Sequence, residues 1–86
     1  MELIFSNRFK KDYKLLNNEQ RKIFKQKIKL FEKNPFYPSL RTKKIQGKED
    51  LFECSINMSI RMTWQYFNNI VLLRAIGEHD HTLKNP

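Results

Sequence analysis

The feature that most constrains the fold of this 86-residue chain is a pair of β-rich segments on either side of Asn68–Asn69. Asparagine tolerates the positive φ angle that a tight hairpin turn requires. We therefore expect these two residues to join two antiparallel strands. The pairing that follows from this turn places Phe67 opposite Ile70, Trp64 opposite Leu73 and Thr63 opposite Arg74.

Side-chain alternation along the paired strands divides this hairpin into two faces. The face expected to join the core carries Met62, Trp64, Tyr66, Val71, Leu73 and Ala75. The outer face carries Arg61, Thr63, Gln65 and Arg74 among Phe67, Ile70, Leu72 and Ile76, and its second strand runs straight into Glu78-His79-Asp80-His81. A basic sheet face that ends in two histidines suggests a site that handles phosphate groups.

The preceding residues supply the helices that such a sheet needs to form a core. Residues 1–5 are typical of a short strand, and Ser6 is a suitable N-cap for a first helix with apolar residues at helical spacing. A second helix is expected from about Asn18 to Lys33, and it ends at Asn34 because the residue before a proline is disfavoured in the α region.

A further strand is expected where apolar residues alternate over residues 51–56, between a turn at 47–50 and a loop at 57–59. Its register pairs Cys54 with Met62, Ser55 with Arg61 and Glu53 with Thr63, since a one-residue slip would bury Glu53. We predict an α+β fold, in which an N-terminal strand and a helical hairpin pack on one face of a largely antiparallel four- to five-stranded sheet.

Length and charge limit the function. Eighty-six residues form one domain at most. Residues 1–50 hold fourteen Lys/Arg against six Asp/Glu, whereas residues 51–86 hold three of each. Such a basic surface is either a solvated face or a binding surface for nucleic acid or an acidic protein. With one cysteine, no signal peptide and no apolar span, we expect a soluble, cytoplasmic protein with no membrane partner.

The order of these elements and several motifs resemble the RelE/ParE superfamily, in particular its RelE/YafQ/YoeB-like mRNA interferase branch. The motifs are the N-P-x-x-P-S-L-R…K-x-x-G connector (34–47), Phe52-Glu53-Cys54-Ser55, Ile60-Arg61-Met62-Thr63-Trp64 and Ile76-Gly77-Glu78-His79-Asp80. The resemblance covers residues 1–86 as a single RelE-like toxin domain.

The resemblance implies the toxin of a toxin–antitoxin module, acting as a ribosome-dependent mRNA endonuclease that cleaves by 2′-hydroxyl attack and inhibits translation. Its partners would be the ribosome, mRNA and a cognate acidic antitoxin in a toxin–antitoxin hetero-oligomer. Two alternatives stay open: a ParE-like inhibitor of DNA gyrase, and a degenerate, non-catalytic member that only binds its antitoxin.

By the same resemblance, Arg61 matches a catalytic arginine of the family, and His79 a position occupied by Arg or His. Lys43 and Lys44 match positions where members often carry His or Lys. Glu53 and Ser55 stand where the lysine-using branch has lysines. No aromatic residue occupies residues 82–84, where some members have one.

Metal-independent RNA cleavage needs a base for the 2′-hydroxyl, stabilisation of charge at phosphorus and an acid for the leaving 5′-oxygen. Arg61 suits the stabilising role, with Arg74 as a second candidate. His79 is the favoured acid or base, and Asp80 would orient a histidine if the backbone there leaves the strand conformation. Glu53 is an alternative base, unless it merely pairs with Arg61 or Arg74.

The remaining candidates would hold RNA. Lys43 and Lys44 would bind its backbone, Phe67 would stack on a base, and His81 is a lesser candidate. The exposed side of the second helix would contact the ribosome through Arg21, Lys22, Lys25 and Lys29. A His-x-His pair can bind zinc, but no cysteine or third ligand accompanies it, so we expect no metal and no cofactor.

Overall fold

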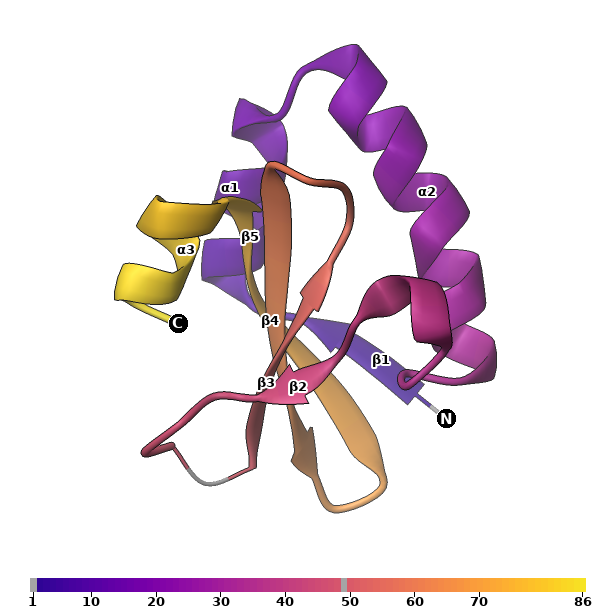
Figure 1. The fold of residues 1–86 in the computed structure, drawn as a ribbon, viewed down its shortest axis with the longest axis vertical. Helices are drawn as coiled ribbons and strands as arrows, with labels where there is room; N and C mark the ends of the chain where they lie inside the picture. Colours follow the sequence, from indigo (N-terminus) through magenta and orange to yellow (C-terminus); the bar gives the residue numbers. More distant parts are fainter. Residues whose placement is uncertain (1, 49) are drawn as a thin grey trace.

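The computed structural model of the chain describes residues 2–48 and 50–86, and it has the predicted α+β architecture (Figure 1). Its elements are β1 (Glu2–Phe5), α1 (Asn7–Leu15), α2 (Asn18–Lys33), a 3₁₀ turn η1 (Pro38–Leu40), β2 (Lys43–Lys44), β3 (Leu51–Ser55), β4 (Ile60–Phe67), β5 (Ile70–Glu78) and α3 (His79–Lys84). Met1 of the predicted first strand and Glu49 of the predicted turn lie outside the described residues.

The five strands form one sheet in the order β1-β5-β4-β3-β2. β1 pairs with β5 in parallel, and the other neighbours are antiparallel. The predicted turn is confirmed, because Asn68 has a φ angle of 57° and Phe67 lies opposite Ile70. The predicted β3–β4 register is confirmed as well. None of the helices in the described residues is long and apolar enough to cross a membrane.

Local hydrogen bonds explain where the two long helices begin. Ser6 Oγ accepts from Phe9 N at 3.0 Å and donates to the Arg74 carbonyl at 2.8 Å, which ties the start of α1 to β5. Asn17 and Gln20 cap α2 reciprocally, each side chain accepting from the backbone N–H of the other. α2 ends at Lys33, as Pro35 predicts.

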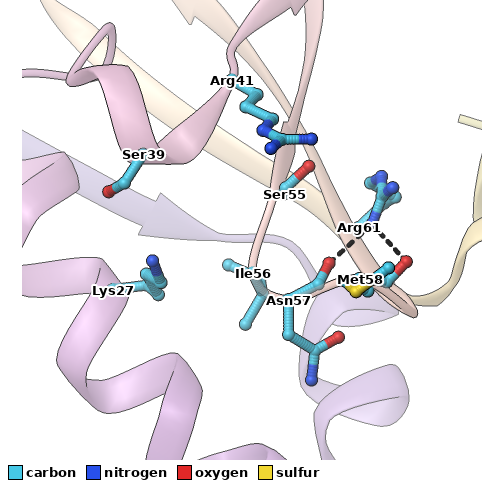
Figure 2. Close-up of a pocket in the computed structure, with 8 residues that line it drawn as sticks. All are labelled: Lys27, Ser39, Arg41, Ser55, Ile56, Asn57, Met58 and Arg61. Atoms are coloured by element: carbon cyan, nitrogen blue, oxygen red, sulfur yellow. Dashed lines mark hydrogen bonds between the residues drawn. The ribbon is translucent and has the colours of Figure 1, made fainter.

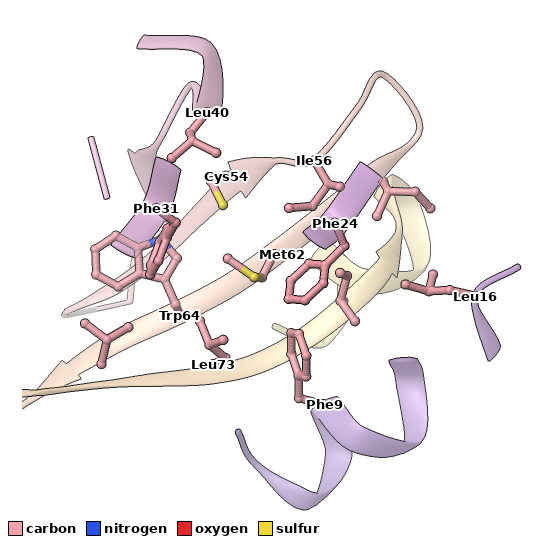
Figure 3. Packing of buried hydrophobic residues seen from close by; sticks show 13 residues of the cluster. Phe9, Leu16, Phe24, Phe31, Leu40, Cys54, Ile56, Met62, Trp64 and Leu73 are labelled. Carbon is pink, nitrogen blue, oxygen red and sulfur yellow. The ribbon is translucent and has the colours of Figure 1, made fainter. Parts of the chain in front are cut away.

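The core lies between the helical hairpin and the sheet (Figure 3). Trp64 and Phe31 are fully buried and meet edge to face with their ring centroids 5.1 Å apart. Tyr66, predicted to be core, is instead 42% exposed. The reason is its place near the β4–β5 turn, which projects beyond the helices. Cys54 is buried, and this burial is the main cause that raises the pKa of its thiol to about 12, so it is no thiolate nucleophile near neutral pH.

A β-bulge corrects the predicted register of the hairpin. The register shifts between Thr63 and Trp64, so Thr63 lies opposite Ala75 and not opposite Arg74. Because β5 carries one extra residue at this point, two side chains lie on the faces opposite to those predicted. Ile76 joins the core, and Ala75 lies on the outer face. Alternation alone does not reveal such an inserted residue.

A third helix, which was not predicted, follows the last strand. β5 ends at Glu78, and α3 folds back over the outer face of β4 and β5. Thr82 of α3 is buried directly above Gly77, where a Cβ atom would lie 2.9 Å from Thr82 Oγ1. Thr63 Oγ1 also donates to the Pro86 carbonyl at 3.1 Å. Part of the face predicted to be open is therefore covered.

Candidate functional site

A polar hollow lies at the end of β3, between the sheet, α2 and η1 (Figure 2). Its volume is about 290 Å³, and we call it the cationic cavity. Its lining residues are Lys27, Ser39, Arg41, Ser55, Ile56, Asn57, Met58 and Arg61. Three of them are basic and none carries a carboxylate, so the cavity is suited to an anion.

Arg61 is held in place by the loop that precedes its own strand. Its Nη1 donates to the carbonyls of Asn57 at 2.7 Å and Met58 at 3.1 Å (Figure 2). The loop is itself ordered, since Asn57 Oδ1 accepts from the backbone N–H groups of Ser59 and Ile60. A guanidinium group fixed in this way loses little freedom when it binds a phosphate with its remaining N–H groups.

Glu53 does not neutralise Arg61 in the described part of the chain. Its carboxylate lies 4.0 Å from Lys43 Nζ instead, so the alternative in which it pairs with Arg61 or Arg74 is wrong for the described residues. Lys43 and Glu53 are opposite each other on the outer face, which also carries Arg61. Lys44 lies opposite Phe52 and therefore points to the other face. The structure thus brings Lys43, but not Lys44, to the face of Arg61.

Arg41 enters the cavity from a left-handed backbone position. It follows η1 with a φ angle of 49° and a ψ angle of 43°. A non-glycine residue in this region costs about 1–3 kcal/mol, and such residues cluster at functional sites. Figure 2 shows its guanidinium close to Ser55. From the sequence, Arg41 was only part of the connector, because no local signal predicts this backbone conformation.

Lys27 is the second cavity residue that sequence analysis missed, although a signal was present. It lies three residues after Phe24 and four before Phe31, on the stripe of α2 that faces the sheet. It is half-buried, whereas Lys22, Lys25 and Lys29 are exposed. A lysine on the apolar stripe of a helix buries its aliphatic stem and directs its ammonium group to water, an anion or a polar hollow.

His79 and Asp80 begin α3 beside the loop that holds Arg61. The His79 N–H donates to the Ser59 carbonyl at 2.9 Å. The His79 imidazole lies 2.9 Å from the Asp80 carboxylate, through Nδ1 and Oδ1, and about half of the His79 side chain is exposed. The start of α3 supplies the change from strand conformation that this pairing requires.

Three predicted residues lie elsewhere. Arg74 Nε donates to the Pro86 carbonyl at 3.2 Å, and Arg74 Nη1 donates to Gln65 Oε1, so its guanidinium is engaged within the chain. His81 lines a different hollow, beside α1. Phe67 is 63% exposed but lies six residues along β4 from Arg61, roughly 20 Å away at the rise of a strand.

The basic residues of α2 divide into two groups. Arg21 donates to the carbonyls of Tyr13 at 3.3 Å and Lys14 at 2.8 Å, and so ties the two helices together. The exposed lysines Lys22, Lys25 and Lys29 remain available to an external partner. No group of three His, Cys, Asp or Glu side chains in the described residues could hold a metal ion.

Comparison with known proteins places the fold. No family model and no curated protein match the chain. Solved structures match it along most of both chains: YafQ from E. coli strain BL21(DE3) has a TM-score of 0.78 at 14% identity and covers 93% of this chain and 94% of its own. A YoeB/ParE toxin from Agrobacterium tumefaciens has a TM-score of 0.78 at 13% identity, with 92% and 99% covered. The RelB-RelE antitoxin-toxin complex from Methanococcus jannaschii has 0.76 at 19% identity, with 91% and 92% covered. The chain therefore has the RelE-like fold of these toxins.

Proposed function

We propose that the chain is the toxin of a toxin–antitoxin pair and a metal-independent endoribonuclease that cuts mRNA on the ribosome. The main support for this proposal is the cationic cavity, because none of its lining residues carries a carboxylate. The loop 57–59, which holds Arg61, also accepts a hydrogen bond from the backbone of His79, the residue that pairs with Asp80. The RelE-like fold supports the toxin assignment.

In the proposed reaction, the 2′-hydroxyl oxygen attacks the neighbouring phosphorus atom and the bond to the 5′-oxygen breaks. The products are a 2′,3′-cyclic phosphate and a free 5′-hydroxyl. Arg61 stabilises the charge that develops on the phosphoryl oxygens, and Arg41 assists it from the other side of Ser55. Both groups keep their charge through the reaction, so this role does not depend on pH near neutrality.

The proton transfers fall to His79 and a second group. An imidazole exchanges protons near neutral pH, and Asp80 holds the His79 ring through Nδ1, which leaves Nε2 for the substrate. Glu53, only 12% exposed and beside Lys43, is the proposed second group on this face. Lys43 would hold the RNA backbone nearby, and Lys22, Lys25 and Lys29 would contact the ribosome.

The direct test is a map of mRNA ends on translating ribosomes incubated with the purified protein. Cuts that follow the reading frame, and that vanish with Arg61→Ala, support the proposal. Intact mRNA under the same conditions, together with inhibition of DNA gyrase, would instead support a ParE-like toxin. Intact mRNA and no arrest of growth on expression would indicate a non-catalytic member.

An acidic antitoxin is the proposed protein partner, and the hairpin of helices offers it a place to bind. Phe5, Phe9, Tyr13 and Phe24 form the floor of a groove of about 490 Å³, and Lys10, Lys14 and Lys25 stand on its rim. We call this the lysine-rimmed groove. Two copies of it would repel each other through their lysines, so its charge favours an acidic, amphipathic segment over self-association.

A further inference from the structure

The cationic cavity is built from two sides of the molecule. Arg61 and Ser55 come from neighbouring strands, and Arg41 leans towards them from the end of η1. Lys27 comes from α2 and Ser39 from within η1, and Figure 2 shows both across the cavity from Arg61. One side therefore offers two guanidinium groups and the Ser55 hydroxyl group, and the other side offers the Lys27 ammonium group, with Ser39 nearby.

The charge in this cavity exceeds what one phosphodiester can neutralise. Lys27, Arg41 and Arg61 form no ion pair within residues 2–48 and 50–86, and none of the lining residues is acidic. A phosphodiester carries a single negative charge, whereas these three groups carry three positive ones. Like charges that share a half-enclosed space repel one another unless anions bind between them.

The cavity is also larger than one phosphate group requires. Its volume of about 290 Å³ is more than one tetrahedral anion needs. Adjacent phosphates of an RNA strand are separated by one ribose, so a strand that enters such a space brings a second phosphate with it.

We infer that the cationic cavity binds two consecutive phosphates. The arginine side, with Arg41, Ser55 and Arg61, takes the phosphate that is cleaved. The lysine side, with Lys27 and Ser39, takes the neighbouring phosphate of the same strand. This inference rests on the proposed function for the identity of the strand. It makes a nucleoside 3′,5′-bisphosphate the smallest ligand that fills both sides.

Equilibrium binding tests this arrangement without any cleavage. Isothermal titration calorimetry would compare adenosine 3′,5′-bisphosphate with adenosine 3′-monophosphate on the wild-type chain and on Lys27→Met. We expect the wild type to prefer the bisphosphate, and Lys27→Met to weaken the bisphosphate about tenfold but the monophosphate less than about twofold. Lys27→Arg should keep most of the preference, because it keeps the charge.

Lys33→Met is the matched control, since Lys33 is exposed at the end of the same helix, does not line the cavity and should change neither affinity. Circular dichroism checks that every variant is folded. Equal binding of the two nucleotides by the wild type, or equal losses with Lys27→Met, would overturn the two-phosphate site. A bisphosphate preference that depends on Lys27 in a protein that does not cut mRNA would keep this site and remove only the nuclease.

Discussion

The cationic cavity and the lysine-rimmed groove each carry three basic side chains, but they hold them in opposite ways. In the cavity, Lys27, Arg41 and Arg61 surround a polar space, and Arg61 is fixed by backbone carbonyls. In the groove, Lys10, Lys14 and Lys25 are exposed around an aromatic floor. Charges that converge bind a small anion, whereas charges around apolar surface guide an amphipathic partner.

The comparison also shows why net charge alone assigns no function. Both sites contribute to the same excess of basic residues in residues 1–50. Whether a group of basic residues suits a phosphate or a protein depends on where the fold places each cation. Variants that damage one site and spare the other are therefore the most informative.

The largest effect is expected from His79→Ala. Loss of a positioned acid or base should slow mRNA cleavage by about 10²–10⁴-fold, measured as single-turnover rates on programmed ribosomes. His81→Ala is the matched control, because His81 lines a different hollow and should stay within a few-fold of wild type. Equal losses in both variants would contradict the assignment of His79.

The next largest effect is expected from Arg61→Ala. It should reduce the cleavage rate by about 10²–10³-fold, because no fixed guanidinium group then stabilises the charge that develops on the phosphate. Arg61→Lys should recover part of the rate, since it restores the charge without the planar fork. The affinity for the acidic partner at the groove should be unchanged in both. If Arg61→Ala lowered partner affinity as well as the cleavage rate, the cationic cavity and the lysine-rimmed groove would not be separate sites.

Gly77→Ala is expected to lower the free energy of unfolding by about 1–3 kcal/mol, measured by urea denaturation. The added Cβ would lie 2.9 Å from Thr82 Oγ1 and would push α3 from the sheet. Because His79 begins α3, cleavage should fall while partner binding is retained. Adding Thr82→Ala should relieve the clash, and a double variant no more stable than Gly77→Ala alone would refute this contact.

The smallest effect concerns the groove. Lys14→Glu should weaken binding of the proposed acidic antitoxin by about tenfold, and more strongly at low salt, because it reverses one rim charge. Lys11→Glu is the control, since Lys11 does not line the groove. Fluorescence anisotropy of the labelled partner would measure both. In the absence of the partner, the rate of mRNA cleavage on ribosomes should be the same in both variants as in the wild type.

Much of the fold was predictable because its signals are local. The Asn68–Asn69 turn, the cap at Ser6 and the end of α2 before Pro35 depend on residues close together in the chain. The candidate site was only partly predictable. Alternation and the resemblance pointed to Arg61, whereas Arg41 and Lys27 join it in the cavity from segments that the sequence pattern does not connect.

By itself, the sequence determined the number, type and order of the long elements and the outward direction of Arg61, since side-chain alternation and turn chemistry act over a few residues. Only the tertiary structure decided the bulge that exchanges Ala75 and Ile76, the return of α3 onto Gly77 and the meeting of three cations in one cavity. These features arise from the packing of segments that are distant along the chain, and packing is a property of the whole molecule rather than of any short stretch of residues.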